Sequence, residues 1–226
     1  MKKKIIIIAV ILVLAIVGII GYFAVSDLMQ GVILRKEIGI IAKLDITKDE
    51  VNMEIKTKGD YAVVEQTIKD YMNTYSINCK ELMKILENEQ MAEILTAENY
   101  KKDGPDFVRT KEYIETTRKN FNERINILID MTSEEVMKAA IEDKGLDENF
   151  KNLYIELMLG EEIEGFENAK IGLAQSNTRI NNILDIQEKV INMLIQNKGK
   201  WEVEDDQIVF SSQTLVEQYN ELISSL

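Results

Sequence analysis

The chain has 226 residues, of which 46% are apolar and 29% are charged, and this composition is typical of a globular protein rather than a disordered one. Its 27 basic residues against 39 acidic ones give a net charge of −12, which disfavours binding to the phosphates of nucleic acids. The sequence holds no histidine and a single cysteine, which excludes a Ser-His-Asp triad, a Cys-His dyad, histidine-ligated metal sites and an internal disulfide.

An unbroken apolar run from Ile5 to Val25 dominates the N-terminal region. At about 1.5 Å per residue, a helix of this length spans a hydrocarbon core of about 30 Å. The run therefore predicts a transmembrane helix over residues 5–25, which would bind the lipid bilayer and anchor the chain by a single pass.

The three lysines Lys2, Lys3 and Lys4 set the expected topology, because basic residues favour the cytoplasmic side of a membrane. Residues 1–4 would then be a short cytoplasmic end, and the C-terminal part would lie outside the cytoplasm, in the cell envelope. A signal peptide cleaved after Ser26 is the alternative, since Ala24-Val25-Ser26 offers small residues at a cleavage position.

Residues 26–59 are expected to form a membrane-proximal segment, beginning with a helix over about 26–43. The stretch 47–58 is ambiguous. Its first residues, Thr47-Lys48-Asp49-Glu50, have the pattern of a helix capping box. Residues 51–56, however, alternate apolar and polar side chains as a strand does.

Residues 60–226 are expected to form an acidic helical domain. The clearest helix covers residues 61–88, where apolar residues recur every three or four positions and Glu65 and Lys69 lie on the opposite face. Further helices are predicted over about 91–101, 106–131, 133–144, 147–160, 161–197 and 213–226. Ser133 and Asp147 are expected to cap two of them.

Residues 201–210 read WEVEDDQIVF and predict a small β-hairpin. A two-residue turn at Asp205-Asp206 would pair Trp201 with Phe210 and Val203 with Ile208, placing all four side chains on one face. Because an isolated hairpin is marginally stable in water, Trp201 and Phe210 are expected to anchor it on the helices.

Few residues suggest chemistry. Acidic clusters at residues 161–167 and 202–206 are best explained as a helix start and a solvated turn. The tyrosines and Cys79 are expected in the core, with the tyrosine hydroxyls hydrogen-bonded. No glycine-rich phosphate loop or EF-hand loop occurs in the sequence, so we expect no cofactor, no metal site and no catalytic residue.

The sequence thus predicts a mostly α fold: an N-terminal transmembrane helix followed by an irregular bundle of about six helices with one small β-hairpin. We expect a non-enzymatic, membrane-anchored protein of the cell envelope that acts through contacts with a protein partner. The first alternative is an envelope ligand-binding module with an apolar pocket between helices. The second is a hydrolase that uses a pair of carboxylates.

Overall fold

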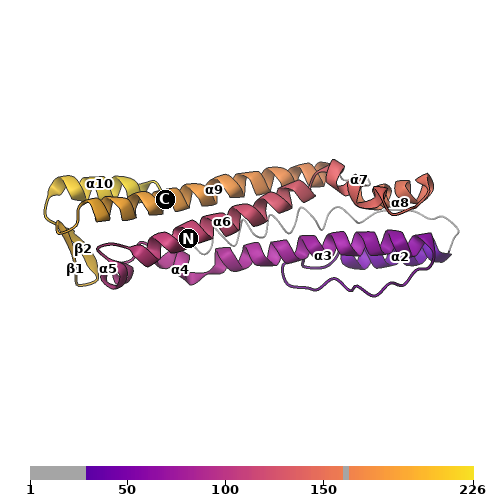
Figure 1. Ribbon diagram of the computed structural model, residues 1–226, viewed down its shortest axis with the longest axis horizontal. Coiled ribbons are helices and arrows are strands. Elements are labelled where there is room, and N and C mark those ends of the chain that lie inside the picture. The colour runs from indigo at the N-terminus through magenta and orange to yellow at the C-terminus, as the bar shows by residue number, and fades with distance from the viewer. Residues whose placement is uncertain (1–28, 160–162) are drawn as a thin grey trace. The chain divides into compact units, whose positions relative to one another are not determined.

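The computed structural model describes residues 29–159 and 163–226, which are mostly helical with one small antiparallel hairpin (Figure 1). These residues divide into two compact units. Within the described part, unit 1 comprises residues 85–122 and 176–226, and unit 2 comprises residues 29–84, 123–159 and 163–175. Three long helices contribute to both units: α3 (Asp60–Glu87), α6 (Val108–Met131) and α9 (Ile163–Gln196).

Unit 2 adds three helices of its own to these: α2 (Met29–Ile41), α7 (Glu134–Glu142) and α8 (Glu148–Leu159). Both predicted caps are confirmed. The hydroxyl of Ser133 accepts a hydrogen bond from the Val136 amide at 3.2 Å, and Oδ1 of Asp147 accepts one from the Asn149 amide at 2.9 Å. These side chains bond amides that have no partner inside their own helix, which fixes where α7 and α8 begin.

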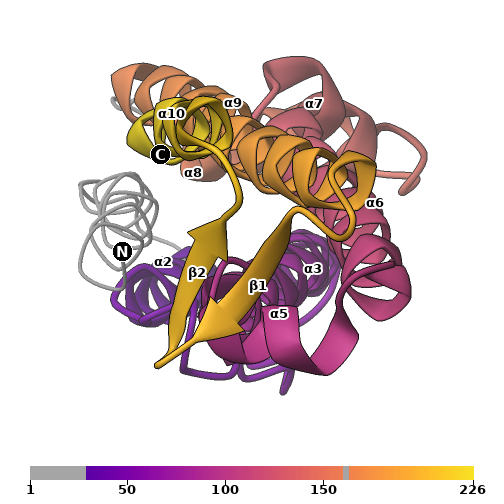
Figure 2. The same ribbon diagram turned by 90° about the vertical axis from the view of Figure 1, so that its left-hand side faces the viewer.

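Unit 1 contains the short helices α4 (Glu89–Glu93) and α5 (Ala97–Asp103), the strands β1 (Trp201–Glu204) and β2 (Gln207–Phe210), and α10 (Gln213–Ser224). Within this unit β1 contacts α5, and β2 contacts α10 (Figure 2). Each strand of the hairpin therefore contacts a helix, which supplies the packing that an isolated two-stranded hairpin lacks.

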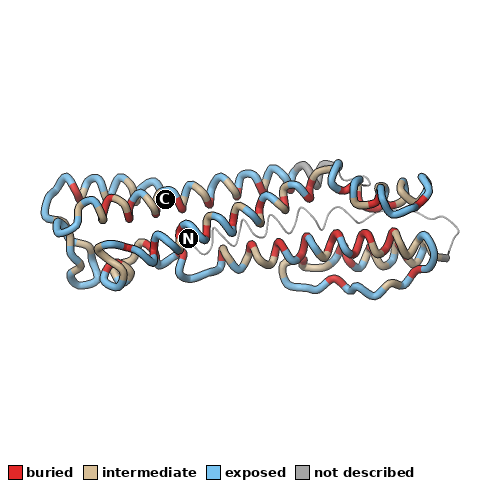
Figure 3. Tube along the Cα trace, in the orientation of Figure 1, coloured by how far each residue is buried: buried red, intermediate tan, exposed pale blue. Residues whose placement is uncertain are grey.

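The apolar pattern of the long helices correctly predicts the core. Along α3, the apolar residues that recur every three or four positions are buried, namely Val64, Ile68, Tyr71, Tyr75, Cys79, Leu82 and Leu86. Buried positions recur in the same way along α6 and α9 (Figure 3). This recurrence follows from the 3.6-residue period of a helix, which places residues three and four apart on one face.

The predicted hairpin is confirmed together with its register. Trp201 pairs with Phe210, and Val203 pairs with Ile208. The turn residues Asp205 and Asp206 have φ angles of 43° and 59°. Two consecutive left-handed residues are what a type I′ turn needs, and Asp tolerates that conformation better than most non-glycine residues.

Two local predictions need correction. Residues 47–58, expected to be a helix or a strand, form neither: the chain turns near residues 46–48, and residues 51–58 are an irregular segment whose backbone is bonded by side chains, as described below. The helix expected over 91–101 is divided into α4 and α5, because Thr96 takes an extended conformation (ψ 151°) and caps the second helix. The Thr96 hydroxyl accepts the hydrogen bond of the Asn99 amide, and such a side-chain bond replaces the backbone bond that would continue the helix through residue 96.

The prediction of a transmembrane, single-pass protein is not supported. Across residues 29–159 and 163–226, no helix combines the length and the apolar character that a membrane crossing requires. The long helices α3, α6 and α9 instead carry charged residues on one face, as amphipathic helices of a bundle do. The segment for which the span was predicted, residues 5–25, lies outside the described residues.

Candidate functional site

A polar pocket of about 310 Å³ lies in unit 1, where α4, α5 and the first turn of α6 meet. Its volume is at the lower end of the range of small-ligand sites, which is about 300–1,000 Å³. Its walls carry amides, hydroxyls and charges of both signs: Gln90, Glu93, Thr96, Glu98, Asn99, Lys102, Asp103, Arg109 and Thr110.

Local capping interactions shape the pocket. Oδ1 of Asn88 accepts a hydrogen bond from the Gln90 amide at 2.9 Å and starts α4. The hydroxyl of Thr96 accepts from the Asn99 amide at 3.2 Å and donates to the Glu93 carbonyl at 2.7 Å. Thr96 therefore both ends one short helix and starts the next, and the change of direction leaves the hollow.

Asn99, Asp103 and Thr110 form the floor of the pocket, and hydrogen bonds hold these side chains in place. Oδ2 of Asp103 accepts from the Thr110 amide at 2.7 Å, and its Oδ1 accepts from Nε of Arg109 at 3.2 Å. Asn99 donates to the Thr110 hydroxyl at 3.1 Å and to the Ile94 carbonyl at 2.8 Å. The floor is thus ordered before any ligand arrives, which reduces the entropy that binding would cost.

The environment of Asp103 keeps its carboxylate charged. Burial alone would raise the pKa of Asp103, but hydrogen bonds from the backbone and hydroxyl of Thr110 and from Arg109 outweigh it, so the pKa lies below its ordinary value. Asp103 therefore holds the first turn of α6 and the Arg109 side chain in place at neutral pH.

The rim of the pocket carries charges that the fold does not use. Glu93, Glu98 and Lys102 are exposed, and none of them forms an ion pair with another described residue. Arg109 is 66% exposed, although it also donates from Nη2 to the Lys102 carbonyl at 2.9 Å. A ligand that carries both a positive and a negative group could therefore be held here by opposite charges.

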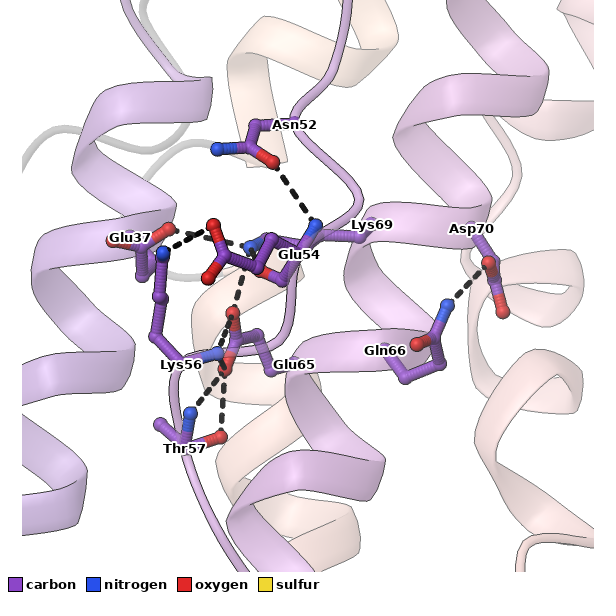
Figure 4. A network of polar contacts seen from close by, with 9 residues as sticks. All are labelled: Glu37, Asn52, Glu54, Lys56, Thr57, Glu65, Gln66, Lys69 and Asp70. Carbon is purple, nitrogen blue, oxygen red and sulfur yellow. Dashed lines mark hydrogen bonds and ion pairs between the residues drawn. The ribbon is translucent and has the colours of Figure 1, made fainter.

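A second polar cluster lies in unit 2, around the buried Glu65 and Lys69 side chains (Figure 4). The ammonium of Lys69 lies 2.6 Å from Oε1 of Glu65 and 3.2 Å from Oε2 of Glu37, and both the Lys69 and Glu65 side chains are 0% exposed. Lys69 also donates to the Glu54 carbonyl at 2.6 Å. The pair is thus connected to the irregular segment 51–58, called the strap below.

Glu65 bonds the strap directly. Its Oε2 accepts from the Thr57 amide at 2.8 Å, the Thr57 hydroxyl at 2.7 Å and the Lys56 amide at 3.0 Å. Burial would raise the pKa of Glu65, yet the hydrogen bonds from Lys69 and from the strap lower it below its ordinary value. The Glu65 and Lys69 side chains are 0% exposed and already bond each other and the strap, so we assign them a structural role.

The residues singled out from the sequence occupy different places. Trp201 stacks on Phe107 with ring centroids 5.8 Å apart, and its indole N–H donates to the Leu194 carbonyl at 2.7 Å. Phe210 lies against Tyr219 with ring centroids 5.3 Å apart. Both side chains thus join the hairpin to the helices of unit 1, and neither lines the polar pocket.

The predicted membrane and topology residues cannot be placed. Ile5, Val25 and the lysines Lys2, Lys3 and Lys4 lie outside the described residues, as do the side chains of the acidic cluster 161–167. The location outside the cytoplasm consequently stays a prediction. In the acidic cluster at residues 202–206, Asp206 forms an ion pair with Lys101 at 2.9 Å. Among the described residues, no three acidic or cysteine side chains lie close enough together to hold a metal ion.

Tyr71, Tyr75, Tyr100, Tyr154 and Cys79 are buried in the core, but the expected hydrogen bonds are missing at Tyr75 and Tyr154, whose hydroxyls have no hydrogen-bond partner among the described residues. Tyr71 donates to the Met131 carbonyl, and the hydroxyls of Tyr100 and Tyr219 lie 3.0 Å apart. Cys79 is free and buried, and burial raises the pKa of its thiol to about 12, so the reactive thiolate is suppressed. None of these residues lines the polar pocket.

Sequence reasoning missed the polar pocket and the buried pair. The signals for the pocket were short: Asn88 two positions before Gln90, and Thr96 three positions before Asn99, both of which are cap patterns. Comparisons of the chain with family models, with curated proteins and with solved structures gave no significant match.

Proposed function

We propose that this chain is a non-catalytic binding protein that recognises a partner protein through the polar pocket of unit 1. The observation that carries the proposal is the combination of an ordered floor with unused charges at the rim. Glu93, Glu98 and Lys102 surround a hollow whose base is already fixed by the Asp103 network. Charges arranged in this way favour specific recognition over strong affinity.

The groups on the floor support binding rather than proton transfer. Asp103, Asn99 and Thr110 all use their polar atoms in hydrogen bonds that hold α5 against α6. A general acid or base would have to give up such a bond to reach a substrate. The pocket is lined by neither tyrosine nor methionine, so it does not favour the alternative of an apolar ligand site.

Site-specific photo-cross-linking in cells tests the proposal. A photoreactive amino acid replaces Gln90, which is exposed at the pocket, so that every rim charge is kept. We expect one discrete protein adduct in this variant. The adduct should disappear when Lys102→Glu is added, because the rim charge that contacts the partner is then reversed.

The matched control places the same photoreactive residue at Lys119, an exposed position of α6 in unit 1 that does not line the pocket. We expect no adduct of the same mass there. Equal adducts at Gln90 and Lys119, or an adduct at Gln90 that Lys102→Glu leaves unchanged, would show that the pocket is not the contact site.

A further inference from the structure

We propose that the pocket binds a short peptide segment in which a basic side chain lies beside an acidic one. This inference rests on the proposed function and specifies the chemistry of the partner. The basic group would be held by Glu93 and Glu98, and the acidic group by Lys102 together with the free edge of Arg109.

The charges at the rim carry the argument. The Asp103 carboxylate is neutralised within the fold by Arg109 and by the Thr110 amide, so it offers little to a ligand. Two carboxylates, one ammonium and part of one guanidinium then remain, and none of the first three is paired within the described residues. A ligand with both signs of charge satisfies this set, whereas a ligand of one sign leaves like charges facing each other.

The overall charge of the chain explains why mixed charge would be selected. At a net charge of −12, the protein attracts any basic peptide to its surface without specificity and repels an acidic one. Lys102 and Arg109 provide positive charge at the hollow, so an acidic group is tolerated there. A peptide with both signs of charge can therefore bind at the hollow without repulsion.

The size of the pocket favours a segment of a polypeptide. A hollow of about 310 Å³ takes a pair of side chains rather than a folded surface. Exposed ion pairs are each weak, so we expect an affinity that depends on several contacts along the segment and falls with added salt.

The test uses the purified full chain and four end-capped hexapeptides. One peptide alternates lysine and glutamate, one holds lysine only, one glutamate only, and one glutamine only. Binding is followed by the backbone amide NMR signals of Asn99 and Thr110 on the pocket floor. We expect the mixed peptide to shift both signals and to bind more tightly than the other three.

A charge reversal sharpens the test. Lys102→Glu should weaken binding of the mixed peptide by about tenfold, because its acidic groups would be repelled at the rim instead of attracted. The same change should strengthen binding of the lysine-only peptide, because its ammonium groups would be attracted there instead of repelled. Lys119→Glu makes the same change of net charge away from the pocket, and should leave the order of the four peptides unchanged.

Several outcomes overturn the inference. One is a mixed peptide that binds no better than the glutamine peptide, and another is an equal effect of Lys102→Glu and Lys119→Glu. A third is a mixture of free lysine and free glutamate that shifts Asn99 and Thr110 at the same concentration as the mixed peptide, which would assign the pocket to small metabolites. A pocket-dependent cross-link at Gln90 without any preference for the mixed peptide would retain the proposed function and reject only its charge chemistry.

Discussion

Removing the buried ammonium with Lys69→Met should destabilise the fold strongly. The side chain is 0% exposed and lies 2.6 Å from Oε1 of Glu65, which is also 0% exposed. Removing one member of such a pair leaves the other charge buried without its counterion and typically costs 3–5 kcal/mol. Because Thr57 and Lys56 still donate to Glu65, we expect the lower end, about 3 kcal/mol, which corresponds to a fall in Tm of about 6–12 °C for a chain of this size.

The double variant Glu65→Leu/Lys69→Met tests the reasoning more sharply. Replacing a buried ion pair by apolar residues is often neutral. Here, however, the carboxylate also accepts from the Thr57 amide, and Lys69 also donates to the Glu54 carbonyl. The double variant leaves the Thr57 amide and the Glu54 carbonyl without these partners, and a buried polar group without a partner costs about 1–3 kcal/mol. We therefore expect the double variant to be at least about 2 kcal/mol less stable than the original chain.

Urea unfolding followed by circular dichroism measures the free energies, and hydrogen exchange at the Thr57 amide shows whether the strap detaches first. Lys84→Met is the control on the same helix. Its ammonium pairs with Glu81 at 2.7 Å, but its side chain is 71% exposed, so the change should stay within about 0.5 kcal/mol. A double variant as stable as the original chain, or a loss below about 1 kcal/mol for Lys69→Met, would refute the assigned role of the pair in holding the strap.

Three further predictions concern Glu65 and Tyr71 in unit 2 and Gly104 in unit 1. The pKa of Glu65 lies below its ordinary value of 4.5, so the charged carboxylate stabilises the fold above pH 4.5, and this contribution is lost as the pH falls through the lowered pKa. The urea concentration at the midpoint of unfolding should therefore decrease when the pH is lowered below about 4.5, and it should decrease less in Glu65→Gln. Gly104→Ala should lower the stability of unit 1 by about 1–3 kcal/mol, seen in Trp201 fluorescence during unfolding, because the new Cβ would overlap the Tyr100 carbonyl oxygen and lie 2.8 Å from the indole ring. Tyr71→Phe should cost about 1–2 kcal/mol in urea unfolding, since the buried Met131 carbonyl loses its donor; no change would mean that the carbonyl finds another partner.

Patterns within one element predicted this fold well. The α3 positions and the hairpin register follow from periods of 3.6 and 2 residues, and each period states which side chains share a face. The turn at Asp205-Asp206 was predicted for the same reason, because only that turn places Trp201 and Phe210 opposite each other. These predictions need no knowledge of what lies elsewhere in the chain.

Properties that depend on a second element were not predictable in this way. Glu65 and Lys69 lie on the polar face of α3, and their sequence pattern matches a solvated face. The strap covers that face and buries both residues, although nothing in the α3 sequence indicates it. The strand pattern of residues 51–56 was misleading, because the strap backbone bonds the Glu65 side chain of α3 rather than a neighbouring strand.

The polar pocket was missed because its construction depends on where a helix is interrupted. Residues 91–101 have the composition of a continuous helix, and a single capping threonine decides otherwise. The start of α5 at Thr96, together with the turn over residues 104–107, brings Asn99 to Thr110 and Asp103 to Arg109. Boundaries of short helices therefore matter more for this site than helix content does.

The two polar clusters use similar residues in opposite ways, which supports the assignment of binding to only one. In unit 2, the Glu65 carboxylate receives donors from Lys69, Lys56 and Thr57, and no part of it reaches solvent. In unit 1, Glu93 and Lys102 are exposed at a hollow and unpaired within the described residues. Since a charge that is already compensated gives a ligand little differential free energy, the exposed rim is where recognition by charge is favourable.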